Sequence, residues 1–288
     1  MRLAHGWVVT PLCALMLLVS PAFAAPQHVV STFLCTDEYV FRLLPRARIA
    51  ALSFEATDRY PVVSTIADQA RGIAAIRPSA ETVLLHSPDL VVMYADTNPQ
   101  LHLQLEKIGI PILDVPWANS LADIRRVTTM LGEKLGARER AAALLAEMDY
   151  KIERARHDAP RESVRALIYE PNGYATAGGV TEEVMHLAGL TNAAPDFPQT
   201  RQGTIPIEAV VAAAPDLLIL NDMPGAKSAR ADLLLHHPAL AALKDATLMA
   251  WAPLTPLLCP GPWSLDAAAS FAALGHKARA LAPARRRN

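Results

Sequence analysis

The sequence has few charged residues, no familiar catalytic pattern and no excess of positive charge. Charged residues make up 19% of the 288 residues and hydrophobic residues 52%, which argues against long disordered segments and supplies sizeable cores. The patterns Gly-x-Ser-x-Gly, His-Glu-x-x-His, P-loop and Gly-x-Gly-x-x-Gly are absent, so the chain lacks the signatures of the common hydrolases, zinc proteases and nucleotide-binding enzymes. The 27 basic and 28 acidic residues give no support for nucleic-acid binding.

Clusters of metal ligands are also lacking in the sequence. The histidines are scattered over predicted helices and their ends, and His236 and His237 are the only pair. Adjacent residues on a helix do not face one another, so this pair predicts a structural role and no metal site. We therefore expect no catalytic residue, no bound metal and no resident cofactor.

The amino terminus has the pattern of a cleavable leader. Arg2 provides a positive start, Trp7 to Val19 is an apolar run, and Ala22-Phe23-Ala24 is a small-residue cleavage site. The run is too short for a comfortable transmembrane helix, and Cys13 is followed by more apolar residues, unlike a lipoprotein acylation site. Residues 1–24 are thus predicted to be a signal peptide that exports a soluble mature protein.

One sequence pattern occurs twice in the chain. Glu81 to Met93 and Glu208 to Leu220 share glutamate, valine and a Pro-Asp-Leu triplet in one register, with aliphatic residues at most other positions. Each copy predicts a short helix, a break at the proline and a strand buried on both faces. Helix, break and strand form a common α/β connection, but the matching register favours two similar lobes over coincidence. A solenoid would need several close repeats.

The alternation of strands and helices stops once, in the middle of the chain. Ser120 to Leu135 and Arg138 to about His157 have apolar residues at helical spacing, and strands resume at Val164. The second helix is either a surface helix of one domain or a stiff connector about 30 Å long, and its place between the repeats favours the connector. We expect α/β lobes with mostly parallel sheets at residues 25–136 and 161–288, and a connecting helix at 137–160.

In open α/β sheets, ligands bind at the carboxyl ends of the strands. These ends are rich in aromatic residues here, although aromatics are only 6% of the chain. Two facing lobes would form a cleft suited to a large, flat, partly apolar ligand. Each residue alone is more readily explained as core or rim, so the group is the stronger evidence. The candidate contacts are Cys35, Thr36, Phe54, Tyr94, Trp117, Tyr169, Tyr174 and Trp263.

Two cysteines, Cys35 and Cys259, remain once the leader is removed. Both fall on predicted cleft loops of different lobes, and an exported protein meets an oxidising compartment in which disulfides form. They could make a cross-lobe disulfide, form a paired feature of the ligand site, or remain two separately buried thiols.

Glu81 and Glu208 occupy the same position of the repeated unit, in the first turn of each predicted helix. The helix dipole ordinarily explains an acidic residue at this position. Because both copies keep it, the pair would lie once on each lobe, which suits paired contacts with basic residues of a partner protein.

Taken together, these residues resemble the periplasmic binding proteins that deliver cobalamin, haem and ferric siderophores to ABC importers. The resemblance covers nearly the whole mature chain. Its most specific piece is S-A-E-T-V-L-L-H-S-P-D-L-V-V at Ser79 to Val92, and A-G-L-T-N at Ala188 to Asn192 and H-P-A-L at His237 to Leu240 also match.

The resemblance implies two Rossmann-like lobes joined by one long helix with little hinge motion. It implies that Glu81 and Glu208 dock on arginines of a membrane permease and that Tyr94, after the first Pro-Asp-Leu strand, lines the cleft. The protein would be periplasmic and monomeric. It would touch the membrane only through the permease and would serve that permease and its ATPase subunit.

The implied ligand is a ferric siderophore or cobalamin, with haem third. The family's S-x-x-x-T-E pattern is altered at Ser31 to Glu38, and its Gly-Gly before the first Pro-Asp-Leu unit is absent, so the ligand stays open. The alternative is an exported enzyme that uses the same cleft, which turnover of a candidate ligand would reveal. A binding module that serves a sensor or chaperone is a third reading.

Overall fold

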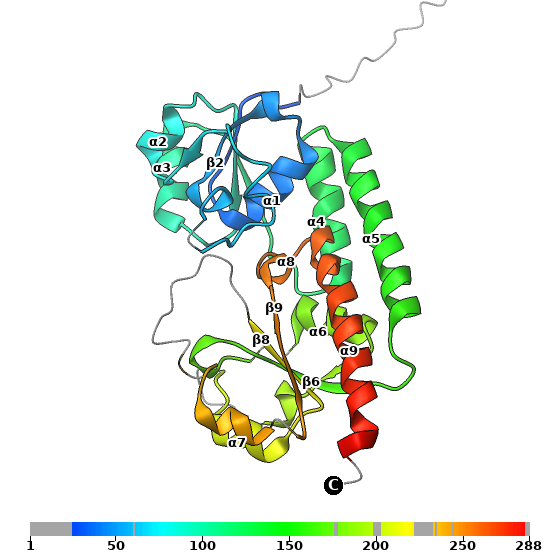
Figure 1. Cartoon of the computed structure of the whole chain (residues 1–288). Helices are drawn as coiled ribbons and strands as arrows, with labels where there is room; N and C mark the ends of the chain where they lie inside the picture. The colour runs from blue at the N-terminus through cyan, green and yellow to red at the C-terminus, as the bar shows by residue number, and fades with distance from the viewer. Residues whose placement is uncertain are drawn as a thin grey trace, which may run out of the picture.

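The chain folds around two separate sheets, both entirely parallel. The computed structural model describes residues 25–59, 61–175, 178–197, 203–221, 233, 235–243 and 245–285. One sheet has the strand order β3-β2-β1-β4-β5 and the other the order β7-β6-β8-β9. Figure 1 shows the two sheets in separate lobes, with long helices along one side. The predicted fold class is thereby confirmed, while the predicted leader lies outside the described residues.

The amino-terminal lobe carries the five-stranded sheet. Short helices and turns connect its strands, and α4 leads out of the lobe. The strands are Val29–Ser31 (β1), Ile49–Ser53 (β2), Ala75–Ile76 (β3), Leu90–Tyr94 (β4) and Ile112–Val115 (β5); the helices are Leu34–Leu43 (α1), Ala80–Leu84 (α2), Pro99–Ile108 (α3) and Leu121–Lys134 (α4), with 3-10 turns at Arg46–Arg48 (η1) and Phe54–Ala56 (η2).

The carboxy-terminal lobe carries the four-stranded sheet. Its connections are shorter and include several 3-10 turns. The strands are Val164–Tyr169 (β6), Leu190–Asn192 (β7), Leu217–Asn221 (β8) and Leu248–Ala252 (β9); the helices are Gly179–Leu187 (α6), Ile207–Ala213 (α7) and Thr255–Leu258 (α8), with 3-10 turns at Pro171–Gly173 (η3), Ala194–Asp196 (η4), Pro238–Leu243 (η6) and Pro262–Leu265 (η7).

The aspartate of the repeated Pro-Asp-Leu triplet has the same structural role in both lobes. The Asp89 carboxylate accepts hydrogen bonds from the backbone N–H groups of Gln27 (2.6 Å) and His28 (3.0 Å), just before β1. In the second lobe, the Asp216 carboxylate accepts one from the N–H of Arg165 in β6 (3.1 Å). Each aspartate thus ties the start of its own Pro-Asp-Leu strand to the neighbouring parallel strand, which explains why both copies contain it.

Side-chain caps begin two helices of the first lobe. The side chain of Ser79 accepts from the N–H of Thr82 at the start of α2, and the side chain of Asn98 accepts from the N–H of Leu101 at the start of α3. Gly109 ends α3 with φ 82°, a left-handed conformation that glycine adopts without steric cost. These local signals set the two ends of α3.

Two long helices form the back of the molecule. Helix α5 (Arg138–Asp158) joins the lobes as predicted, and α9 (Asp266–Arg285) runs beside it (Figure 1). Between them, Lys151 Nζ lies 2.5 Å from Asp266 Oδ1 of α9 and 2.6 Å from Glu147 Oε1 of its own helix. One long helix therefore connects the lobes, as predicted, and the C-terminal helix α9 packs along it.

A single hydrophobic core runs through both lobes. It contains Val29 and Val92 from the first sheet, Ile168 and Ile219 from the second, and Phe271 of α9 between them, all at most 1% exposed. Smaller clusters cover the outer face of each sheet. Since the inner faces share one close-packed interior, bending one lobe against the other would open voids, and we expect a stiff frame.

The chain returns to the first lobe after β9, where a disulfide joins Cys259 to Cys35 of α1. Nearby, Tyr39 donates a hydrogen bond to the carbonyl of Pro260 (3.1 Å), and its ring packs edge-on against Trp263 at 4.8 Å between centroids. The stretch from Thr255 to Leu265 is called the strap below. Of the three alternatives for these cysteines the structure has the disulfide, and both residues are buried, so the bond lies in the interior and not on the predicted cleft loops.

Candidate ligand cleft

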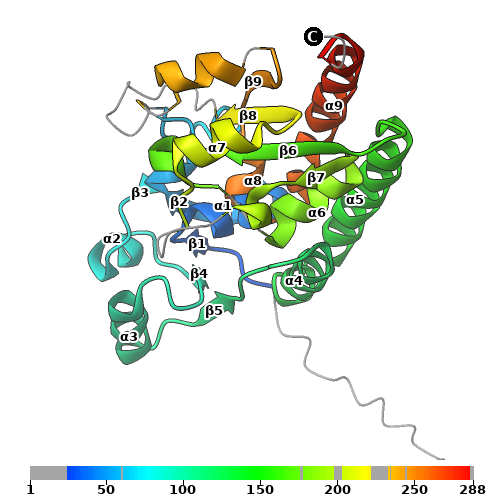
Figure 2. The same cartoon turned by 90° about the horizontal axis from the view of Figure 1, so that it is seen from below.

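The carboxyl ends of the two sheets point toward each other, and the lobes touch beside this gap (Figures 1 and 2). The N–H of Leu121, at the first residue of α4, donates a 2.7 Å hydrogen bond to the Glu183 carboxylate of α6 in the other lobe. On the strap, the Thr255 hydroxyl donates to the carbonyl of Val62 (3.5 Å). These contacts set the spacing of the lobes at the ends of the strands, where a ligand of an α/β protein binds.

An aromatic cluster lines the first lobe's side of this region. The rings of Phe33 and Tyr94 meet edge-on at 5.6 Å, and those of Tyr94 and Trp117 at 5.1 Å. Trp117 is 47% exposed, whereas Tyr94 is buried beneath it. The cluster therefore offers a broad apolar surface with Trp117 outermost, and Tyr94 supports that surface from below.

Tyr94 also borders a cavity of about 360 Å³ at the ends of β4 and β5. His102 and Asp114 lie on its wall, with Nε2 of His102 3.0 Å from Oδ2 of Asp114. The hydrogen bond to Asp114 raises the pKa of His102. This side of the cavity is polar and acidic, which gives the apolar cluster a hydrogen-bonding border.

A cation sits at the ends of β2 and β3. The Arg77 guanidinium lies 4.0 Å above the centre of the Phe54 ring, a cation–π geometry. Arg77 is exposed and Phe54 half-buried. The sequence predicted Phe54 at this edge but not Arg77, which lies just after a short strand in a stretch read as irregular.

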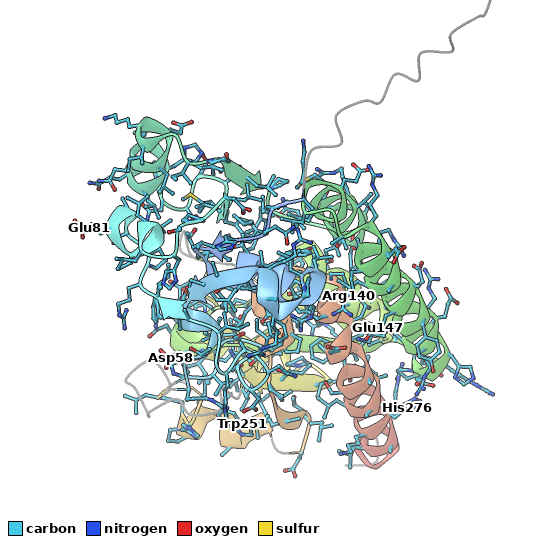
Figure 3. The ribbon with its side chains drawn as sticks, turned by 90° about the horizontal axis from the view of Figure 1, so that it is seen from above. Asp58, Glu81, Arg140, Glu147, Trp251 and His276 are labelled. Atoms are coloured by element: carbon cyan, nitrogen blue, oxygen red, sulfur yellow. A yellow bond between two sulfur atoms is a disulfide. The ribbon has the colours of Figure 1, made fainter. Side chains whose placement is uncertain are left out.

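Two aromatic side chains of the second lobe are exposed near strand ends. Tyr174, after β6, and Trp251, one residue before the end of β9 and labelled in Figure 3, are each 46% exposed. The Trp251 ring stacks on His236 with centroids 5.2 Å apart. Beside them, the Asn221 amide donates to the Glu170 carboxylate (3.2 Å). Trp251 was not among the predicted contacts, because its strand alone did not show which face it occupied.

Four predicted contacts belong to the core in this structure. Thr36 and Tyr169 are fully buried, and Trp263 is 2% exposed. The Tyr169 hydroxyl donates to the carbonyl of Ile205, and the Trp263 indole N–H donates to the carbonyl of Cys259. Cys35 is in the disulfide. Their polar atoms are satisfied inside the protein, so these residues support the cleft and do not line it.

A buried acidic pair on α1 holds the loops below the cleft. The Asp37 carboxylate accepts from the N–H (3.1 Å) and hydroxyl (2.5 Å) of Ser53 at the end of β2. The Glu38 carboxylate accepts from the N–H of Thr65 (2.6 Å) and pairs with Arg42. Burial raises the pKa of Asp37 to about 7, although the hydrogen bonds from Ser31 and Ser53 oppose this shift.

This raised pKa has a direct consequence for stability. Between about pH 4 and pH 7 the folded protein holds a proton on Asp37 that the unfolded chain has released, so this carboxyl makes the free energy of unfolding fall as pH rises. Asp37→Asn, which keeps the neutral form, is expected to remove that fall. Urea denaturation at pH 4, 5, 6 and 7 gives the free energy of unfolding of both proteins. The value for Asp37→Asn minus the value for the wild type should increase with pH, and a constant difference would contradict the prediction.

The repeated glutamates are exposed on both lobes. Glu81 lies on the outer end of α2 (Figure 3), and Glu208 lies in the first turn of α7. Neither carboxylate forms an ion pair with another described residue. Both are therefore free, within that part of the chain, to meet a cation from outside.

The described residues hold no group of three metal-ligating side chains arranged to bind a metal ion. In the same part of the chain, no helix is both long enough and apolar enough to cross a membrane.

Solved structures with the same fold are binding proteins. The periplasmic haem-binding protein RhuT from Roseiflexus sp. RS-1 has 22% identity over 88% of this chain and 98% of its own, with a TM-score of 0.66. The vitamin B12-binding protein BtuF of Vibrio cholerae has 17% identity over 88% and 98%, with a TM-score of 0.63. An Fe³⁺-hydroxamate transport protein from Saccharomonospora viridis has 21% identity over 88% and 93%, with a TM-score of 0.62.

A search of curated protein sequences gave no match. The family model for periplasmic binding proteins matches residues 29–247, well over half of the chain and most of both lobes. Members of this family bind solutes and are not enzymes, as the absence of catalytic patterns predicted. This chain belongs to the periplasmic binding protein family.

Proposed function

We propose that this protein captures a ferric siderophore or cobalamin, with haem as a third candidate, between its lobes and delivers it to an ABC permease and its ATPase subunit. It works as a periplasmic monomer, exported by the leader at residues 1–24. Residues 25–136 and 161–288 are the lobes and 137–160 the connecting segment. The observation that carries the proposal is the Phe33–Tyr94–Trp117 cluster at the strand ends of the first lobe, with Trp117 exposed.

The chemistry of the cleft favours a large ligand with apolar faces. Haem, Fe³⁺-hydroxamate and vitamin B12, for which the similar structures are named, are all metal chelates with broad, partly apolar surfaces. Trp117 and Tyr174 can each bury about half of an aromatic ring against such a surface. The metal in this proposal is cargo held by its own chelator, so it needs no ligand cluster on the protein.

Arg77 gives a way to separate the candidate ligands. Its guanidinium, exposed beside Phe54, would attract carboxylate or other anionic groups of a chelate. Cyanocobalamin carries no net charge, so Arg77 would contribute little to its binding.

The test is a binding panel read by tryptophan fluorescence and native mass spectrometry. Wild-type protein and Arg77→Gln are titrated with cyanocobalamin, an anionic ferric siderophore and haemin. We expect at least one chelate to bind the wild type one to one and to leave unchanged. If that chelate is anionic, Arg77→Gln weakens it about tenfold or more, the size of one charge-assisted contact; if it is cyanocobalamin, affinity changes little.

Arg71→Gln is the matched control for this panel. Arg71 is an exposed arginine whose side chain pairs with Asp68, and it precedes β3, away from the strand ends. Its removal should leave all affinities unchanged. No binding by any of the three chelates, or chemical conversion of one, would contradict the proposed function.

A further inference from the structure

The outer face of α2 combines a carboxylate with two exposed leucines. Glu81, Leu84 and Leu85 stand at positions i, i+3 and i+4, which share one face of a helix. Leu84 is 38% exposed and Leu85 81%, while Val83 is fully buried against the sheet. A surface helix ordinarily places polar residues on its outer face. The folding of the lobe therefore does not account for these two leucines.

The second copy of the repeat has the same pattern. In α7, Glu208 is followed at i+3 and i+4 by Val211 and Ala212, while Val210 is fully buried. Val211 is half-buried and Ala212 exposed. Each lobe thus places an apolar surface one turn beyond its exposed glutamate, and the surface on the first lobe is the larger of the two.

Both helices lie on the same side of the molecule. Figures 1 and 2 show α2 and α7 in separate lobes, opposite the side formed by α5 and α9. A single flat partner could therefore reach both glutamates and both apolar surfaces at once. The exposed carboxylates call for basic groups on that partner, since neither is paired with a described residue of this chain.

We propose that Leu84 and Leu85 bind the permease beside Glu81, in a contact where a basic side chain of the permease is bordered by apolar ones. This rests on the proposed function and adds to it an unequal docking surface: an apolar anchor on the first lobe and a mainly ionic contact on the second.

The test measures binding of ligand-free protein to its permease–ATPase complex in lipid nanodiscs by biolayer interferometry. Leu84→Ser/Leu85→Ser is expected to weaken binding about tenfold, in line with the burial of two partly exposed leucines. Leu85→Ser alone, at the more exposed position, should give part of this loss without disturbing the fold. Val211→Ser should have a smaller effect than the double variant.

Tyr150→Ser is the matched control, because Tyr150 is 61% exposed on α5, on the opposite side of the molecule. It should bind as the wild type does. If the wild type binds the complex and the leucine variants bind equally well, the leucine contact is wrong while the proposed function stands. If the wild type binds neither the complex nor a chelate, the proposed function fails and the leucine contact fails with it.

Discussion

Charge reversal at both docking glutamates, Glu81→Lys with Glu208→Lys, is expected to abolish transport and leave chelate affinity unchanged. Each carboxylate is exposed on a separate lobe, away from the aromatic cluster at the strand ends. In the proposed complex each meets a basic residue of the permease, and reversal places like charges together, which costs several kcal/mol at an interface. Uptake of the chelate identified by the panel, in proteoliposomes with permease and ATPase, should fall about 100-fold or more.

Each single variant should lose less uptake than the double variant does. If Leu84 and Leu85 also bind the permease, Glu81→Lys should lose more uptake than Glu208→Lys. Glu153→Lys is the control for the single variants, since Glu153 is a 72% exposed glutamate on α5 whose reversal changes the net charge as much as either single reversal does. Retained uptake by the double variant would refute the docking role. A loss of chelate affinity in that variant would instead place the glutamates at the ligand.

Removing the disulfide is expected to lower the free energy of unfolding by about 2–5 kcal/mol. Cys35 and Cys259 are 224 residues apart, so the bond restrains nearly the whole unfolded chain and ties the strap to α1. Cys35→Ser/Cys259→Ser and the oxidised wild type would be compared by guanidinium denaturation without reductant. Chelate affinity should change little, because both cysteines are buried and do not line the cleft.

Thiol labelling provides the check on the starting material. Native wild-type protein should resist alkylation until it is reduced and unfolded. Two freely alkylated cysteines without reductant would show that the bond is not formed. Equal stability of the oxidised wild type and the double variant would show that the strap is held by its packing, for example by Tyr39 against Trp263, and not by the bond.

The architecture was predictable because its signals are local. The repeated Pro-Asp-Leu unit, the caps at Ser79 and Asn98, and the glycine after α3 each act within a few residues of the chain. The packing of α9 on α5 and the return of the strap to α1 join residues more than a hundred positions apart. Neither periodicity nor capping signals carry that information, so the sequence did not predict the packing of α9 on α5, and it gave the Cys35–Cys259 bond only as one of three alternatives.

The site was predicted less well, because the end of a strand does not reveal which way a side chain points. Trp117 and Tyr174 are exposed at strand ends as expected, whereas Tyr169, the last residue of β6, turns into the core and bonds to Ile205. Side chains alternate across a sheet, so one residue decides between cleft and interior. Phe33, two residues after the end of β1, was missed for the same reason.

The shared core has a consequence for what each lobe could be on its own. Phe271 of α9 and Val29 of β1 belong to one interior that also includes strands of the second sheet. A chain cut between the lobes would expose a large hydrophobic surface on both fragments. Each fragment would then aggregate or associate with another chain through that surface. The two sheets look like separate domains, but because they share one core we expect them to fold as a single unit. Neither lobe should fold when it is expressed alone.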